Sequence, residues 1–126
     1  MGPRSGRGVA PLNLDSIVGV CKAYTTRVGA GPFPTEDQGI SDYLHGLGRE
    51  FGATTGRARR CGWLDTVLLR MSCMVNGVTD LAVTNLDGLD ERESVEVCTG
   101  YEIDGAVHEL PPADRSAWDR ATPVYE

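Results

Sequence analysis

The chain has 126 residues, with 18 Asp or Glu against 12 Lys or Arg, so its formal net charge at pH 7 is −6. This length suits one small domain with one hydrophobic core, and the acidic balance argues against nucleic acid or an anionic membrane as a partner. No segment approaches the ~18 apolar residues that a membrane-spanning helix needs. We therefore expect a cytoplasmic protein that binds neither nucleic acid nor a membrane. The four cysteines form no Cys-x-x-Cys pair, which argues against a zinc site or a redox dithiol and favours reduced, mostly buried thiols.

The chain changes character near residue 12. Residues 1–11 are rich in Gly, Pro and Arg, so we expect a disordered lead-in, followed by one domain over 12–126. The next apolar residues recur at helical spacing and predict a short helix: Leu14, Ile17, Val18 and Cys21. Residues 23–28 are β-branched or aromatic and predict a strand. The strand ends at a Gly- and Pro-rich loop over 29–36, whose composition favours a stiff connector, although loops at strand ends also carry binding sites.

Two helices are predicted in the middle of the chain. Residues 39–50 have one apolar face on a helix that glycines weaken, and His45 lies off that face, so we expect it on the surface. Residues 63–75 form the strongest helical pattern, which ends at Asn76-Gly77, and its Met and Trp stripe is expected in the core. Asp65, in the first turn, suits the helix dipole and could pair with a nearby arginine.

Strands and turns predominate in the last third. Residues 78–84 predict a strand followed by a polar turn at 85–90, and residues 94–101 and 106–110 predict a β-hairpin. The tail after the hairpin is rich in Pro and Asp, and no closing element is expected there, with Trp118 as its one large anchor. Together the elements predict an α/β fold with a mixed, mostly parallel sheet, flanking helices and a C-terminal hairpin.

The loop from Gly52 to Arg60 (GATTGRARR) has the clearest chemistry in the chain. Its glycines allow backbone N–H groups to converge on a ligand, and its threonines add hydroxyl groups. Arginine forks match carboxylate and phosphate geometry. The loop therefore predicts an anion site, with an equally supported alternative in which it is a surface turn whose arginines pair with local acids.

Three blocks of sequence resemble the adenylosuccinate synthetase family. They are KAYTTRVGAGPFPTE at 22–36, GATTGR at 52–57 and RCGWLD at 60–65, and their order and spacing resemble that family as well. The resemblance spans about residues 9–126. It implies a ligase that joins IMP and L-aspartate with GTP in purine and AMP biosynthesis, with Mg²⁺ as cofactor, a P-loop-type fold and a homodimer.

The resemblance also implies which residues contact each ligand. The aspartate loop would comprise Ala53, Thr54, Thr55, Gly56, Arg57, Ala58 and Arg59. Val28 and Arg57 would contact IMP, and Arg59, Asn85, Leu86 and Asp87 would bind GTP. Asp87 would select guanine, because a carboxylate can accept hydrogen bonds from the N1–H and 2-amino groups of the base. Asn85 stands where the family usually has lysine, so one contact to the base differs.

Other family features have no counterpart in this sequence. No Gly-rich phosphate loop surrounds Lys22, the only lysine, and no catalytic residue or metal ligand is expected in the segment. Mg²⁺ would be bound by an amino-terminal region that is missing here, as is the family's C-terminal segment after Glu126. We therefore expect a fragment that is inactive alone. A non-catalytic nucleotide- or dicarboxylate-binding fragment, or an unstable remnant, are the alternatives.

Overall fold

The computed structural model describes residues 14–126, so the lead-in expected at residues 1–11 lies outside the described part. The strands are β1 (Val18–Lys22), β2 (Thr25–Arg27), β3 (Arg60–Gly62), β4 (Leu64–Asp65), β5 (Asp80–Thr84), β6 (Val97–Ile103), β7 (Ala106–His108) and β8 (Thr122–Tyr125). The helices are α2 (Gln38–Gly46), α3 (Thr66–Asn76), α4 (Arg115–Trp118) and the short 3₁₀ helix η2 (Leu86–Gly88).

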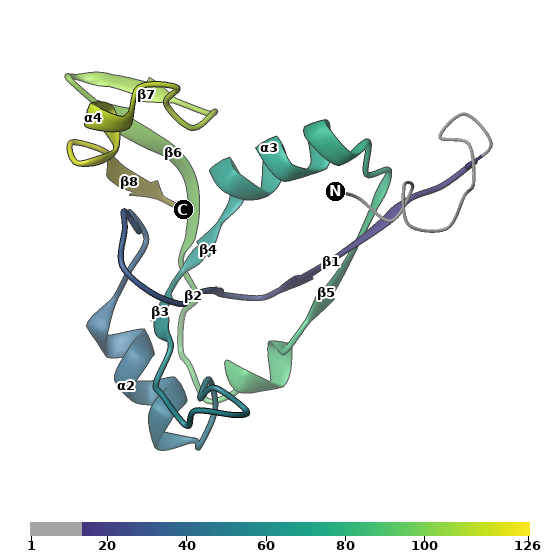
Figure 1. The fold of residues 1–126 in the computed structure, drawn as a ribbon, viewed down its shortest axis with the longest axis vertical. Helices are drawn as coiled ribbons and strands as arrows, with labels where there is room; N and C mark the ends of the chain where they lie inside the picture. Colours follow the sequence, from purple (N-terminus) through teal and green to yellow (C-terminus); the bar gives the residue numbers. More distant parts are fainter. Residues whose placement is uncertain (1–13) are drawn as a thin grey trace.

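Both parallel and antiparallel strands occur, which confirms the predicted mixed α/β class. Strand β1 is parallel to β5, and β2 is antiparallel to β3. Strand β6 has β4 as a parallel neighbour and β7 and β8 as antiparallel neighbours. Figure 1 shows β6, β7, β8 and α4 together at one end, α2 at the other, and the β1–β5 pair extending away from both.

The helix predicted from Leu14 to Cys21 is wrong, because residues 18–22 form strand β1. Val18 pairs with Asp80 and Lys22 with Thr84 in a regular parallel register. The valines of this segment are β-branched and Gly19 weakens a helix, so pairing with β5 overrides the helical spacing of the apolar residues. The strand predicted at 23–28 is confirmed over Thr25–Arg27.

The two predicted helices are confirmed with shifted ends. Helix α2 ends earlier than predicted, and α3 begins later than predicted. Helix α2 begins after Asp37, whose carboxylate accepts a hydrogen bond from Ile40 N, and it ends at Gly46. Helix α3 begins after Asp65, and it ends at Gly77, which adopts a left-handed conformation with φ of 59°. Glycine occupies that conformation without strain, which explains the stop.

Asp65 pairs with no arginine among residues 14–126, although the sequence had suggested that it could. Its Oδ1 accepts a hydrogen bond from Leu68 N and caps α3, and its Oδ2 accepts one from the Tyr101 hydroxyl. Asp65 is 3 % exposed and Tyr101 is 0 % exposed. The pair therefore joins the start of α3 to the middle of β6 inside the protein.

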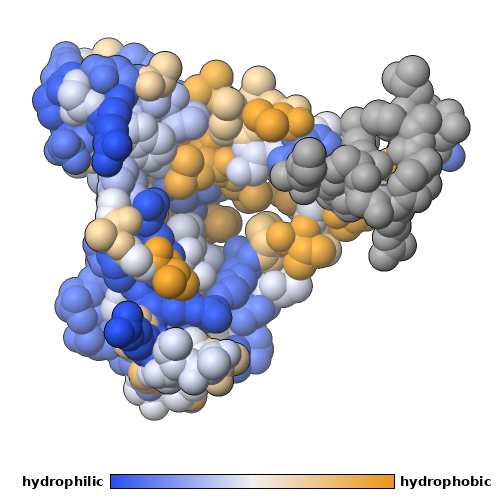
Figure 2. Space-filling model, in the orientation of Figure 1, coloured by the Kyte–Doolittle hydropathy of each residue, from blue (hydrophilic) through white to orange (hydrophobic). Residues whose placement is uncertain are grey.

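The prediction of a buried Met and Trp stripe holds only for its first part. Trp63 and Val67 are buried, whereas Met71, Met74 and Val75 are 40 %, 62 % and 71 % exposed. Among the described residues, exposed apolar side chains of α3 and of β1 and β5 leave apolar surface, seen as the orange atoms around α3 and the β1–β5 pair in Figure 2. The helix is amphipathic, but within residues 14–126 little packs against its second half.

The predicted C-terminal hairpin is confirmed by β6 and β7, which meet at Asp104 and Gly105. Both turn residues have positive φ, as the tight hairpin turn favoured by Asp-Gly requires. The expectation that no element follows is wrong, because the tail forms α4 and then β8 alongside β6. Trp118 anchors this tail against Tyr101, with ring centroids 6.0 Å apart.

The buried residues form two clusters. One comprises Ala23, Tyr24, Ile40, Leu44, Cys61, Trp63 and Leu89. The other comprises Val67, Cys98, Tyr101, Ile103 and Ala117. All four cysteines are free thiols, two buried and two half-buried, and burial raises the pKa of Cys61 to about 11. Among residues 14–126, no helix has the length and apolar character needed to cross a bilayer.

Candidate functional site

The candidate site lies where the parallel strands β1 and β5 end. Lys22 and Thr84 are paired at these carboxyl ends, and Ala23 N donates to Thr84 O over 2.9 Å just beyond them. Turn 85–88 follows β5, and Tyr24 follows β1. In open α/β sheets, ligands bind beyond the carboxyl ends of parallel strands, so this is the expected location.

The predicted anion loop is a closed turn. Phe51 and Ala58 form an isolated antiparallel bridge, and Gly52 N donates to Arg57 O over 2.8 Å. Gly56 N donates back to Gly52 O, also over 2.8 Å. In the described part of the chain, the N–H groups of residues 53–55 donate no hydrogen bond, and residues 53–58 are exposed. The tip of the loop therefore offers backbone donors to a ligand.

Gly52 lies close to the Thr55 side chain in this turn. A Cβ atom at that position would lie 2.8 Å from the Thr55 hydroxyl oxygen. Thr55 Oγ1 in turn accepts a hydrogen bond of 3.4 Å from Arg57 N. The small residue and the hydroxyl group thus shape the loop together.

The three arginines of the loop have different surroundings. Arg60 holds Glu36 through two hydrogen bonds of 2.7 and 2.6 Å, and its Nη1 donates to the carbonyls of Gly29 and Gly31 over 3.1 and 2.9 Å. It therefore fastens the Gly- and Pro-rich loop, so for Arg60 the alternative of a structural ion pair is correct. Arg57 forms no ion pair with any residue in 14–126.

Arg59 is half-buried and is held at one end only. Its Nη1 donates to Glu50 Oε2 over 3.2 Å. Its Nε is buried and has no hydrogen-bond partner among the described residues. About a third of the Arg59 side chain (34 %) is exposed, and this part of the guanidinium is accessible to a ligand.

Glu50 is the centre of a hydrogen-bond network beneath the loop. Both of its carboxylate oxygens lie 2.7 Å from Lys22 Nζ, and the Tyr24 hydroxyl donates to Oε1 over 2.8 Å. Its side chain is 5 % exposed. Burial raises the pKa of Glu50, but the hydrogen bonds from Lys22, Tyr24 and Arg59 outweigh that effect and lower it below its usual value. The carboxylate therefore stays ionised.

The turn after β5 carries the predicted GTP residues. Asn85 has a left-handed φ of 59°, and its Nδ2 donates to the Tyr24 hydroxyl over 3.4 Å. Asp87 Oδ2 accepts a hydrogen bond of 2.6 Å from Arg49 Nη2, and this partner lowers the pKa of Asp87. The Asp87 side chain is 66 % exposed, so it remains accessible to a ligand.

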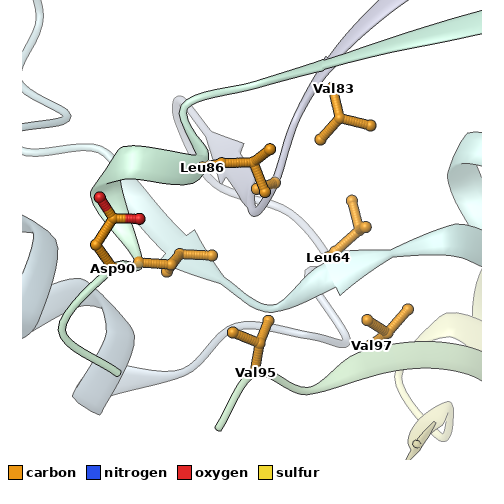
Figure 3. A pocket seen from close by; sticks show the side chains of 8 residues that line it. Leu64, Val83, Leu86, Asp90, Val95 and Val97 are labelled. Carbon is orange, nitrogen blue, oxygen red and sulfur yellow. The ribbon is translucent and has the colours of Figure 1, made fainter. Parts of the chain in front are cut away.

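Leu86 faces an apolar cavity instead of the polar network. The cavity has a volume of about 390 Å³, and Figure 3 shows Leu86 pointing into the space shared with Val83 and Leu64. Val95 and Val97 line its opposite side. Leu86 is 59 % exposed, so its side chain is available for contact with an apolar surface such as the face of a base.

The structure links the predicted aspartate loop to the predicted GTP turn. Arg59 and Asn85 are joined through Glu50 and Tyr24. Val28 is 79 % exposed and directly follows β2, whose last residue, Arg27, pairs with Arg60. No described contact links Arg57 to the turn at 85–87.

Three residues at the site were not predicted from the sequence: Tyr24, Arg49 and Glu50. An acid next to a Gly-rich loop is a common surface feature, and nothing in its spacing shows that it is buried. The one sequence feature that pointed to this network was Lys22, the only lysine in the chain, because a lone lysine is a natural partner for a buried carboxylate. His45 was expected on the surface but is half-buried, and its Nε2 lies 3.0 Å from the Arg59 carbonyl.

A metal site is not formed by the described residues. Over 14–126, no group of three or more His, Cys, Asp or Glu side chains is placed to hold a metal ion. The acids near the site are engaged with cations: Glu36 with Arg60, Glu50 with Lys22 and Arg59, and Asp87 with Arg49.

Comparison with known proteins gives a consistent picture. A sequence model of adenylosuccinate synthetase matches residues 1–126. The adenylosuccinate synthetase of Fusobacterium nucleatum subsp. nucleatum is 51% identical over 126 residues, which cover 99% of this chain and 30% of that protein. The enzyme of Nitratidesulfovibrio vulgaris (strain Miyazaki F) is 53% identical over 123 residues, covering 97% and 29%.

The similarity extends to a solved structure. The fully ligated adenylosuccinate synthetase from Plasmodium falciparum superimposes with a TM-score of 0.87 at 38% identity, covering 98% of this chain and 30% of that one. The chain thus spans about 30% of the length of these relatives.

Proposed function

The chain belongs to the adenylosuccinate synthetase family, and from this premise we propose that it carries the aspartate loop and the guanine-recognition turn of the ligase. The ligase would join IMP and L-aspartate with GTP to form adenylosuccinate, a C–N bond-forming step of AMP biosynthesis. Because the chain spans about 30% of its relatives, it would supply part of the substrate-binding surface and not the complete reaction.

The observation that carries the proposal is the state of Arg59. Its guanidinium is fixed at Nη1 by Glu50, while 34 % of its side chain stays exposed. The neighbouring backbone N–H groups of residues 53–55 are exposed and without acceptors in the described chain. A dicarboxylate such as L-aspartate supplies acceptors for the guanidinium and for these N–H groups, and charge-assisted hydrogen bonds are stronger than neutral ones.

Asp87 would bind the guanine base of GTP. Arg49 engages its Oδ2, and no described donor other than the backbone engages its Oδ1. The lowered pKa of Asp87 keeps the carboxylate ionised, so it accepts hydrogen bonds from the N1–H and 2-amino groups of guanine, which adenine cannot offer in that arrangement. Leu86 would contact the base through its apolar side chain, and Asn85 shapes the turn. Arg59 would also reach a phosphate of GTP.

IMP would be bound beside the aspartate loop. Val28 is exposed and directly follows β2, whose Arg27 pairs with Arg60 at the end of the loop. Arg57 is exposed and without an ion pair in the described chain, so its guanidinium can donate to ribose oxygens. The purine would then lie next to the aspartate whose amine it receives.

Mg²⁺, on which the family generally depends, would neutralise phosphate charge during phosphoryl transfer. The residues described here do not form a site for it, so we propose that it is held by parts of the family's length that this chain does not span. On the same ground the 126-residue chain alone would not complete the ligation. A cytoplasmic location and a homodimer are proposed from family membership.

Isothermal titration calorimetry of the 126-residue chain tests the proposal. We expect saturable heat with L-aspartate, reduced by about tenfold or more in affinity in both R57A and R59A, because each removes charged hydrogen bonds. The diamide of L-aspartic acid, which keeps the amine and has amides in place of both carboxylates, is the control ligand. Absence of aspartate binding by the folded wild-type chain, or equal binding of this diamide, would contradict the proposal.

A further inference from the structure

Glu50 has a backbone conformation that is unusual for its residue type. Its φ is 60°, in the left-handed region that non-glycine residues rarely occupy. Such strained conformations persist where the surroundings enforce them, and they cluster at functional sites. The conformation directs the carboxylate inward, where 5 % of the side chain is exposed.

The donors to Glu50 come from separate segments. Lys22 ends β1, Tyr24 precedes β2, and Arg59 precedes β3. A buried carboxylate with this many donors is fixed in both position and charge. Loss of any one donor would leave the buried negative charge less well compensated. Glu50 is therefore a rigid reference point beneath the anion loop.

Arg59 gains a fixed orientation from this contact. An unanchored arginine side chain samples many rotamers, and ordering it opposes ligand binding. The contact at Nη1 leaves Nη2 without a partner among the described residues, and 34 % of the side chain is exposed to a ligand. Arg57, two residues earlier, has no comparable anchor in the chain from 14 to 126.

The same carboxylate reaches the turn that follows β5. The Tyr24 hydroxyl donates to Glu50 Oε1 and accepts from Asn85 Nδ2, over 2.8 and 3.4 Å. Asn85 opens the turn that carries Asp87. One buried group thus connects the arginine of the anion loop with the turn, although a helix and three strands separate the two in the sequence.

We propose that Glu50 is a positioning residue: it orients Arg59 for an anionic substrate and, through Tyr24, fixes Arg59 relative to the turn at 85–87. It touches no substrate itself. The identity of the two ligands rests on the function proposed above, whereas the positioning of Arg59 does not.

The first test needs no ligand. In NMR spectra of the chain labelled with ¹⁵N-arginine, slow rotation of the Arg59 guanidinium is expected in the wild type and rapid averaging in E50Q, with Arg57 averaged in both. The glutamine side chain of this variant would present an amide donor or a weaker acceptor to Arg59, while keeping the shape of the original side chain. If Arg59 rotates as freely as Arg57 in the wild type, the inference is overturned.

The second test uses ligand affinities and separates positioning from general stability. E50Q is expected to bind L-aspartate about tenfold more weakly, because Arg59 loses its orientation. Y24F keeps the contact between Glu50 and Arg59, so it should retain aspartate binding while its affinity for GTP falls severalfold. E36Q, which breaks the neighbouring Arg60 ion pair, is the matched control and should retain aspartate binding.

The outcomes distinguish the two proposals. A folded wild-type chain that binds no aspartate contradicts the proposed function, and the guanidinium rotation of Arg59 then still decides the role of Glu50. A wild type that binds aspartate and an E50Q variant that binds it equally well contradict the positioning role. If E50Q, Y24F and E36Q all lower the affinities for L-aspartate and GTP equally, the effect is a general structural one, and this result would also overturn the positioning role. If E50Q does not fold, the wild-type rotation measurement and Y24F decide.

Discussion

Arg49 Nη2 lies 2.6 Å from Asp87 Oδ2, while the next residue, Glu50, turns inward to Arg59. Two consecutive residues of opposite charge therefore contact the two parts of the proposed site. The left-handed φ of Glu50 makes this divergence possible, because it rotates the chain between the two side chains.

The first prediction concerns base selection. D87N replaces the carboxylate by an amide, which offers one acceptor in place of two and adds a donor. The variant should lose most of its preference for GTP over ATP, which a site of this kind can raise to a factor on the order of 10⁴. Calorimetry with both nucleotides measures the ratio. R49M, which keeps the carboxylate, is the control, and an unchanged ratio in D87N would refute the role of Asp87.

The second prediction concerns the buried pair of Asp65 and Tyr101. Y101F removes the hydroxyl that donates to Asp65 Oδ2 and leaves a buried carboxylate with one hydrogen bond fewer. Losing a partner of a buried charged group lowers the free energy of unfolding by about 1–3 kcal/mol. Urea denaturation followed by circular dichroism measures this change. Y43F, at a half-buried position without such a partner among the described residues, should change stability little.

The third prediction follows from the lowered pKa of Glu50. Its hydrogen bonds favour the ionised form in the folded chain, so folding shifts the pKa below the usual value of 4.5. This contribution to stability is complete above that value and is lost as pH falls through the lowered folded pKa. The free energy of unfolding should therefore decrease from about pH 5 downwards, and less steeply in E50Q than in the wild type. Parallel pH profiles of the two proteins would contradict the assignment.

The fourth prediction concerns two glycines with opposite surroundings. A Cβ atom at Gly62 would collide with the backbone of Thr35, coming within 2.6 Å of its carbonyl carbon, whereas one at Gly46 would meet no atom within 4 Å. G62A should lower the free energy of unfolding by several kcal/mol, about 3 or more, because backbone must move. G46A, in helix α2, should be neutral or stabilising by up to about 1 kcal/mol. Thermal melts compare the two.

The sequence predicted best those elements whose ends have strong local signals. The left-handed Gly77 explains why the end of α3 was recognisable, and Asp104-Gly105 did the same for the hairpin. Local chemistry was sufficient in both cases. Anion binding by the loop at 52–60 was predicted from residue types alone and stays a prediction.

The failures arose where long-range pairing decides the outcome. The valines of β1 become a strand because β5, some 60 residues later in the chain, pairs with them. Strand β8 forms because β6 has an edge that accepts it. The burial of Glu50 depends on residues 22–24 and on Arg59, which converge on it from separate parts of the chain, so no spacing within the sequence could indicate it.

The exposed apolar surface of α3 and the β1–β5 pair also determines how the chain behaves at the bench. Among the described residues, Val20 of β1 is 73 % exposed and Val75 of α3 is 71 % exposed. Such surfaces adhere to one another and bind amphiphilic dyes, so light scattering should rise with protein concentration and an added fluorescent probe such as ANS should brighten. Dilute samples and a mild non-ionic detergent are therefore the conditions under which ligand titrations will report on single molecules.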